Sequence, residues 1–268
     1  MDHYHGGWQE LFPSGSGPGF YQGAYLGYHG EVASCAWDYR ILVDEPEVIE
    51  VLLTVKTLRT PFLLEKKIRL ESGKSIIYLQ EKITNYGKKG MHFMWGHHPS
   101  FGAPFLSEEC TLALPPCKII PLQKPGDNSR LSKAEEFDWP LGIDREGNQV
   151  DLRQIRGSEA ACSDMLFATS YKEGWYALTN HRMGLGVGMV WPVEDFPHLW
   201  IWQDFGGTAD YPWYGNAYTM AVEPFTSRVD RGDDGLNEAI RNGTAAWIGA
   251  GEETAKELKV VSTKQHVK

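Results

Sequence analysis

Residues 62–85 read FLLEKKIRLESGKSIIYLQEKITN, two alternating segments joined by a short polar turn. In the second segment Ile77, Leu79, Glu81 and Ile83 fall on one face and the intervening residues on the other, which is the period of a β-strand. The linker ESGKS has the glycine and serine of a tight hairpin. These residues therefore predict two antiparallel strands that bury one face.

The same alternation recurs along the chain, whereas long helical periodicity is almost absent. Further strands are predicted at residues 48–57, 174–180, 185–191, 198–205 and 217–227. Residues 123–155 are polar and rich in turn formers, and predict a long excursion between strands. Residues 232–242 predict one short helix. We expect an all-β fold, a large antiparallel β-sandwich of two packed sheets, with residues 1–268 as a single domain.

Composition narrows the classes of partner. The chain has 26 Lys and Arg against 35 Asp and Glu, a net charge of −9, which repels nucleic acid and anionic lipid. No apolar run is long enough to span a bilayer, and the N-terminus lacks the pattern of a signal peptide. We expect a cytoplasmic protein with neither a nucleic-acid nor a membrane partner. The four cysteines show no CxxC spacing and predict free thiols, with a bridge between Cys110 and Cys117 as the alternative.

Aromatic residues are the most informative part of the composition. Ten Trp, twelve Tyr and eleven Phe make up 12% of the chain. Aromatic faces pack cores, but they also stack on the apolar faces of sugar rings. The composition therefore favours, among binding functions, a surface that handles carbohydrate.

Two side chains are candidates for proton transfer. His98 follows His97 and precedes Pro99, whose ring favours extended backbone at residue 98, so the pair is expected at a strand end. Imidazole is well matched to proton transfer near neutral pH, although a hydrogen-bonded structural pair is the alternative. Glu223 should share a strand face with Thr219 and Ala221. A glutamate is costly to bury there unless it is paired, and the alternative is a strand-end glutamate that faces water.

Other polar residues are less specific. Asp164 and Asp204 could bind sugar hydroxyls or cap turns. His3, His5 and Glu10 have a spacing that could hold a metal, but no companion histidine motif follows them. No glycine-rich nucleotide loop is present either. We therefore expect neither a metal nor an organic cofactor.

Four motifs resemble, in this order, those of the aldose 1-epimerase (galactose mutarotase-like) superfamily: ITNYGKKGMHFMWGHHPSFG, SDMLF, HLWIWQDFGG and AVEPFTS. The segment GGWQELFP is similar to the bacterial aldose 1-epimerase-related branch. The resemblance covers about residues 3–228 and implies a large antiparallel β-sandwich. Family members usually have several strands, and often a sugar-binding arginine, before the HGG segment. We expect an N-terminally short sandwich, in which the completeness of the pocket and the formation of a homo-oligomer are open.

The resemblance also implies site residues and an activity. His98 corresponds to the family's general acid and Glu223 to its base, while Asp164 and His5 correspond to residues that bind the sugar. Trp95 and Trp202 are candidates for stacking on it. The implied activity is that of an isomerase in carbohydrate metabolism, which interconverts α and β anomers of a hexose or modified sugar by opening the ring. At pH 7 this scheme needs His98 partly protonated and Glu223 ionised.

Two other functions fit the same residues. One is a non-catalytic carbohydrate-binding protein of this fold. The other is a glycoside hydrolase that uses Glu223 with Asp164 or Asp204, which requires two carboxyl groups about 5 to 9 Å apart. A histidine–glutamate couple suits reversible ring opening better than cleavage.

Overall fold

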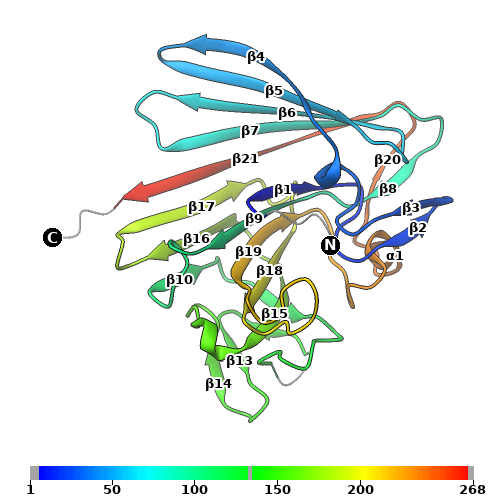
Figure 1. Ribbon diagram of the computed structural model, residues 1–268. Coiled ribbons are helices and arrows are strands. Elements are labelled where there is room, and N and C mark those ends of the chain that lie inside the picture. Colours follow the sequence, from blue (N-terminus) through cyan, green and yellow to red (C-terminus); the bar gives the residue numbers. More distant parts are fainter. Residues whose placement is uncertain (1–5, 132–134, 265–268) are drawn as a thin grey trace.

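The computed structural model describes residues 6–131 and 135–264, and two large antiparallel sheets dominate it (Figure 1). The first sheet has seven strands, in the order β1 (Trp8–Leu11), β9 (Gly96–Gly102), β19 (Tyr218–Phe225), β18 (His198–Phe205), β15 (Cys162–Thr169), β11 (Lys118–Pro121) and β12 (Phe137–Asp138). The second has eight, in the order β10 (Cys110–Ala113), β16 (Gly174–Asn180), β17 (Leu185–Trp191), β21 (Glu253–Lys264), β7 (Ile76–Asn85), β6 (Phe62–Glu71), β5 (Val48–Lys56) and β4 (Asp38–Glu45). The predicted all-β sandwich is confirmed.

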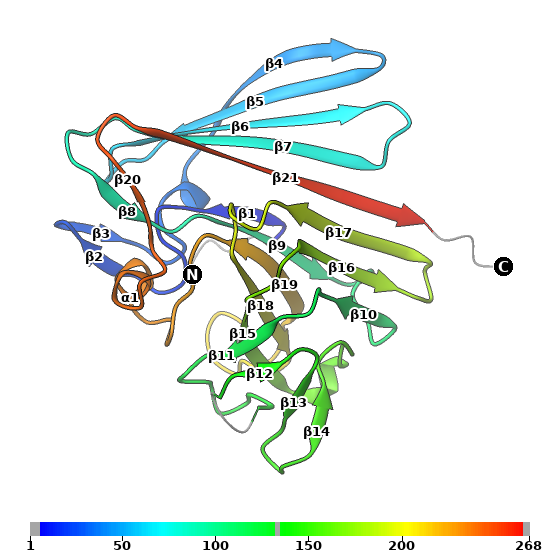
Figure 2. The same ribbon diagram turned by 180° about the vertical axis from the view of Figure 1, so that it is seen from behind.

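The smaller elements lie around the ends of these sheets, as both views show (Figures 1 and 2). Three two-stranded ribbons pair β2 (Gly19–Tyr21) with β3 (Ala24–Leu26), β8 (Met91–Phe93) with β20 (Ala246–Ile248), and β13 (Leu141–Ile143) with β14 (Gln149–Asp151). The helical elements are η1 (Val32–Ser34), η2 (Ser158–Ala160) and α1 (Gly235–Arg241). Within the described residues, no helix is long and apolar enough to cross a bilayer.

The strands predicted from residues 62–85 form the middle of the eight-stranded sheet. Strands β6 and β7 pair antiparallel across the predicted hairpin, with Leu64 opposite Ile83 and Ile68 opposite Leu79. The other strand predictions are confirmed within one or two residues, and the predicted helix is α1, which is shorter than residues 232–242. The excursion at 123–155 contains β12, β13 and β14. All four cysteines are free, so Cys110 and Cys117 are not bridged.

Two buried clusters make up the core. One lies between the sheets and includes Leu79, Leu166 and Leu258, each at most 3% exposed. The other lies where the N-terminal segment and α1 cover the end of the seven-stranded sheet, and includes Phe12 and Leu236. Successive residues of a strand point to opposite faces. The seven-stranded sheet therefore has one face toward the core between the sheets and one face that is partly open, and this open face carries the candidate site.

Candidate functional site

His98 and Glu223 lie side by side on neighbouring strands of the seven-stranded sheet. The register pairs Gly96 with Phe225 and Ser100 with Ala221, which puts His98 and Glu223 at the same level and on the same face. The Nε2 atom of His98 is 3.5 Å from Oε1 of Glu223, and their side chains are 6% and 2% exposed. The Ser100 hydroxyl is 3.2 Å from the other ring nitrogen, Nδ1 of His98. We refer to His98 and Glu223 as the couple.

Burial determines how the couple holds protons. It lowers the pKa of His98 to about 4 and raises the pKa of Glu223 well above its usual value of 4.5. Both shifts have the same cause, because a low-dielectric site disfavours the charged form of each group. At pH 7 the imidazole is therefore neutral, and burial favours the protonated form of the carboxyl group that it faces. Burial thus disfavours the expected state, in which His98 is protonated and Glu223 is ionised.

The couple borders a pocket of about 570 Å³ on the open face of the sheet. A pocket of this size fits a small organic ligand. Three segments complete its walls: residues 125–128 of the excursion, the loop at 207–213 and the loop at 229–232. Among the described residues, the acidic and basic side chains of the lining are those of Asp127, Asp164, Asp210, Glu223 and Arg231.

A second histidine, His29, faces the couple and was not identified from the sequence. It lines the pocket, and its ring centroid lies 5.2 Å from that of His98. Its backbone has a φ of +65°, which is uncommon outside glycine and is often found at functional sites. The next residue, Gly30, has a φ of +78°, and a Cβ there would lie 2.5 Å from the Phe12 carbonyl oxygen. The His–Gly pair at residues 29 and 30 was the sequence feature that could have pointed to His29 as a site residue.

The candidates for sugar binding fall in three different places. Trp202 lines the pocket, with its ring 5.9 Å from that of His98. Trp95 does not line it: the side chain is fully buried in the second core cluster, and its Nε1 donates a hydrogen bond of 2.6 Å to Glu10. The expectation that Trp95 stacks on the sugar is corrected accordingly, because core packing and this hydrogen bond account for it. His5 lies outside the described residues.

Asp164 borders the pocket, but other groups occupy its carboxylate. Oδ1 accepts hydrogen bonds from the Ser129 hydroxyl at 2.9 Å and the Arg130 backbone N–H at 3.0 Å. Oδ2 forms an ion pair with the Arg130 guanidinium, which also binds Gln203, the residue opposite Asp164 on β18. These contacts anchor the excursion to the sheet. Asp204 likewise uses Oδ1 to accept the backbone N–H groups of Gly207 and Thr208, at the base of the 207–213 loop.

His97 points to the other face of β9, into a buried ionic network between the sheets. Its Nε2 lies 2.9 Å from Glu81, which lies 3.2 Å from the Lys66 ammonium group. Lys66 also forms an ion pair with Glu10, which stands opposite His97 on β1. Burial alone would raise the pKa of Glu81, but the charges and hydrogen bonds of His97 and Lys66 lower it to about 2. His97 is thus a structural neighbour of the site. Glu10, which the sequence offered as a possible metal ligand with His3 and His5, is ion-paired with Lys66 in this network.

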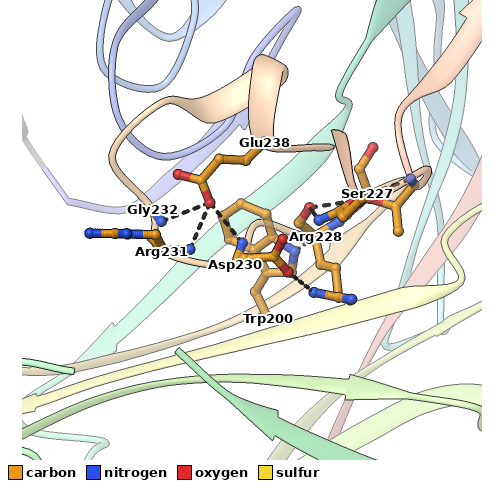
Figure 3. Close-up of polar contacts among 9 residues, drawn as sticks. Trp200, Ser227, Arg228, Asp230, Arg231, Gly232 and Glu238 are labelled. Atoms are coloured by element: carbon orange, nitrogen blue, oxygen red, sulfur yellow. Dashed lines mark hydrogen bonds and ion pairs between the residues drawn. The ribbon is translucent and has the colours of Figure 1, made fainter. Parts of the chain in front are cut away.

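The loop at 229–232 is organised by a single carboxylate, that of Glu238 in α1 (Figure 3). Its Oε2 accepts the backbone N–H groups of Asp230, Arg231 and Gly232 at 2.6 to 3.1 Å. Its Oε1 accepts those of residues 233 and 234. Burial would raise the pKa of Glu238, but these backbone hydrogen bonds lower it to about 2. The carboxylate is therefore ionised at neutral pH, and it fixes the loop that carries Arg231 to the pocket.

The comparisons with known proteins agree with this fold. Residues 14–261 match the family model described as a domain of unknown function, DUF4432. No curated protein matches the sequence. A Klebsiella pneumoniae protein provisionally called an aldose 1-epimerase superposes with a TM-score of 0.72 at 14% identity, over 96% of this chain and 62% of that one. The present chain thus spans less than two thirds of that relative.

Two further solved structures extend the comparison. A galactose mutarotase related enzyme from Lactobacillus acidophilus has a TM-score of 0.62 at 18% identity, over 96% of this chain and 83% of that one. A galactose mutarotase-like protein from Clostridium acetobutylicum has a TM-score of 0.60 at 15% identity, over 97% and 80%. The superpositions establish a shared fold, whereas sequence identities this low leave the activity open. The chain belongs to the DUF4432 family, and its fold is that of the galactose mutarotase-like proteins.

Proposed function

We propose that the protein is an isomerase of the aldose 1-epimerase type, which interconverts the α and β anomers of an aldose. The observation that carries the proposal is the couple, which is buried beside a pocket large enough to admit a sugar. Opening a pyranose ring requires removal of the proton from the anomeric hydroxyl and delivery of a proton to the ring oxygen. One group that can accept a proton and one that can donate it are sufficient for both transfers.

The directions of the pKa shifts support an assignment of the first step. Neutral His98 accepts the proton of the anomeric hydroxyl, and protonated Glu223 donates its own proton to the ring oxygen, so that the C1–O5 bond breaks and the aldehyde forms. After rotation about the C1–C2 bond the roles reverse, and the ring closes with the other configuration at C1. The two residues hold one proton before and after the cycle, so the pair is the titrating unit. Each positioned proton transfer contributes about 10² to 10⁴ in rate.

The remaining residues of the pocket have binding roles in this scheme. His29, facing His98, can hydrogen-bond a sugar hydroxyl, and the Trp202 ring can stack on the apolar face of the pyranose. Asp127 and Asp210 outnumber Arg231 in the wall, which favours an uncharged sugar over a phosphorylated one. The hydrolase alternative loses support because Asp164 is paired with Arg130 and Asp204 with backbone N–H groups.

Exchange NMR on equilibrated D-glucose, D-galactose, D-mannose and D-xylose tests the proposal. The wild-type protein should accelerate α–β exchange of at least one of these aldoses above the spontaneous rate. A protein that binds a sugar, shown by line broadening or saturation transfer, and leaves its exchange unaccelerated would instead be a non-catalytic carbohydrate-binding protein.

A further inference from the structure

The pocket is larger than one sugar ring requires. A hexopyranose occupies roughly 200 Å³ at the packing density of a protein interior, whereas the pocket measures about 570 Å³. The couple can engage only the reducing sugar, whose C1 carries the free anomeric hydroxyl. A ring seated at His98 and Glu223 therefore leaves space in the pocket for more of the substrate.

Aromatic side chains follow this space away from the couple. The Trp202 ring contacts both the His98 ring and the Trp213 ring, with centroids 5.9 and 5.8 Å away. Tyr211, on the same loop as Trp213, also lines the pocket, although its side chain remains 56% exposed. Large rings at the mouth of a pocket lose little conformational entropy when a ligand stacks on them.

The loop that carries Tyr211 and Trp213 is held in place by its own hydrogen bonds. Asp204 binds the backbone N–H groups of Gly207 and Thr208 at its start, and the Gly215 N–H donates to the Thr208 carbonyl at 2.8 Å. The Trp213 N–H donates to the Asp210 carbonyl at 3.0 Å. A wall fixed in this way presents its rings before a ligand arrives, which lowers the ordering cost of binding.

We propose that this aromatic wall is a second saccharide subsite, so that the substrate is the reducing end of a disaccharide or longer glycan. This inference rests on the proposed function for the reaction, but the subsite itself is a binding property. The reducing sugar occupies the couple and Trp202, and the next sugar stacks on Tyr211 and Trp213. Asp210, beside these rings in the pocket lining, can accept hydrogen bonds from the hydroxyls of the second sugar.

Two measurements on the full chain test the subsite. Titration of intrinsic tryptophan fluorescence gives the Kd of D-glucose, maltose and cellobiose, and exchange NMR gives kcat/KM for their reducing ends. At least one disaccharide should bind about 5- to 10-fold more tightly than D-glucose, as expected for one additional stacked ring. Equal or weaker binding of both disaccharides would overturn the subsite, even if all three sugars are isomerised.

Variants separate the subsite from the proposed function. Tyr211→Ala and Trp213→Phe should lower the disaccharide-to-monosaccharide ratio of affinities, while Tyr39→Ala should leave that ratio unchanged, because Tyr39 is an exposed residue of β4 outside the pocket lining. A ratio that Tyr211→Ala does not change would contradict the subsite. Preferential disaccharide binding without acceleration would support the subsite and refute the isomerase. Acceleration of anomerisation without preferential disaccharide binding would support the isomerase and refute the subsite.

Discussion

Lys66 is the residue whose replacement tests the buried network most severely. Its ammonium group forms ion pairs with Glu10 from the seven-stranded sheet and Glu81 from the eight-stranded sheet, and the two carboxylates are 3% and 1% exposed. In Lys66→Met these two carboxylates would remain buried together without their shared cation. The Glu81 pKa of about 2, against 4.5 ordinarily, corresponds to roughly 3 kcal/mol of stabilisation at neutral pH. Removing one partner of a buried pair costs about 3 to 5 kcal/mol.

We therefore expect Lys66→Met to lower the free energy of unfolding by about 3 to 5 kcal/mol at pH 7. The sign of the pH dependence follows from the pKa shifts. The wild-type protein loses the contribution of Glu81 as the pH falls below 4.5 toward 2, whereas in the variant burial and mutual repulsion raise the pKa values of both carboxyls. In the folded variant these carboxyls therefore gain protons at a higher pH. The difference in the free energy of unfolding between the two proteins should shrink as the pH falls from 7 to 5.

Urea denaturation followed by tryptophan fluorescence measures this difference. Lys67→Met is the matched control, because Lys67 is the next residue on β6, is 39% exposed, and lies 3.6 Å from Glu50 in a surface ion pair. That replacement should cost less than about 1 kcal/mol. The view that the network joins the two sheets would be refuted if Lys66→Met lost no more free energy of unfolding than Lys67→Met and if this loss did not depend on pH.

Three further predictions follow from the site. Because burial lowers the pKa of His98 to about 4, kcat/KM for anomerisation should fall near pH 4, and the raised pKa of Glu223 should place the basic limb well above pH 4.5. An acid limb near pH 6.5 would contradict the assignment. Glu223→Gln should be more stable than wild type by about 1 to 3 kcal/mol at pH 8 and little different at pH 4. The reason is that a carboxyl with a raised pKa in the folded state costs stability as the pH rises above 4.5. Thermal unfolding at both pH values measures this difference. Glu238→Gln should lower stability by roughly 3 kcal/mol and weaken sugar binding, since five backbone N–H groups, three of them in the 229–232 loop of the pocket wall, lose a carboxylate acceptor. A sugar affinity equal to that of wild type would show that the loop does not depend on Glu238.

Strand periodicity was sufficient to predict the sheets and to place Glu223 on a face with Ala221. It could not give the offset between β9 and β19, and only the register of Ser100 with Ala221 brings His98 level with Glu223. That offset depends on contacts between segments more than 100 residues apart in sequence, which a local pattern does not encode.

Other parts of the site depend on tertiary packing in the same way. The sequence motif suggested Trp95 as a pocket residue, but its position in the chain could not show that its indole would be buried against Glu10. The role of Asp164 depends on Arg130, which the long excursion returns to the sheet. The pocket role of His29 requires a left-handed backbone that is set by its surroundings. The pKa shifts of the couple follow from its burial, which no motif records.

In the proposed mechanism, His98 and Glu223 act together on the anomeric centre. Exchange NMR of α–β interconversion tests it most directly, with wild type beside Glu223→Gln and His98→Asn on whichever aldose the wild type accelerates most. Each replacement should lower kcat by about 10² to 10⁴, and the double variant should lose little more than either single one, because the two residues act as a unit. Single variants that retain wild-type rates while still folded and binding the sugar would contradict this mechanism.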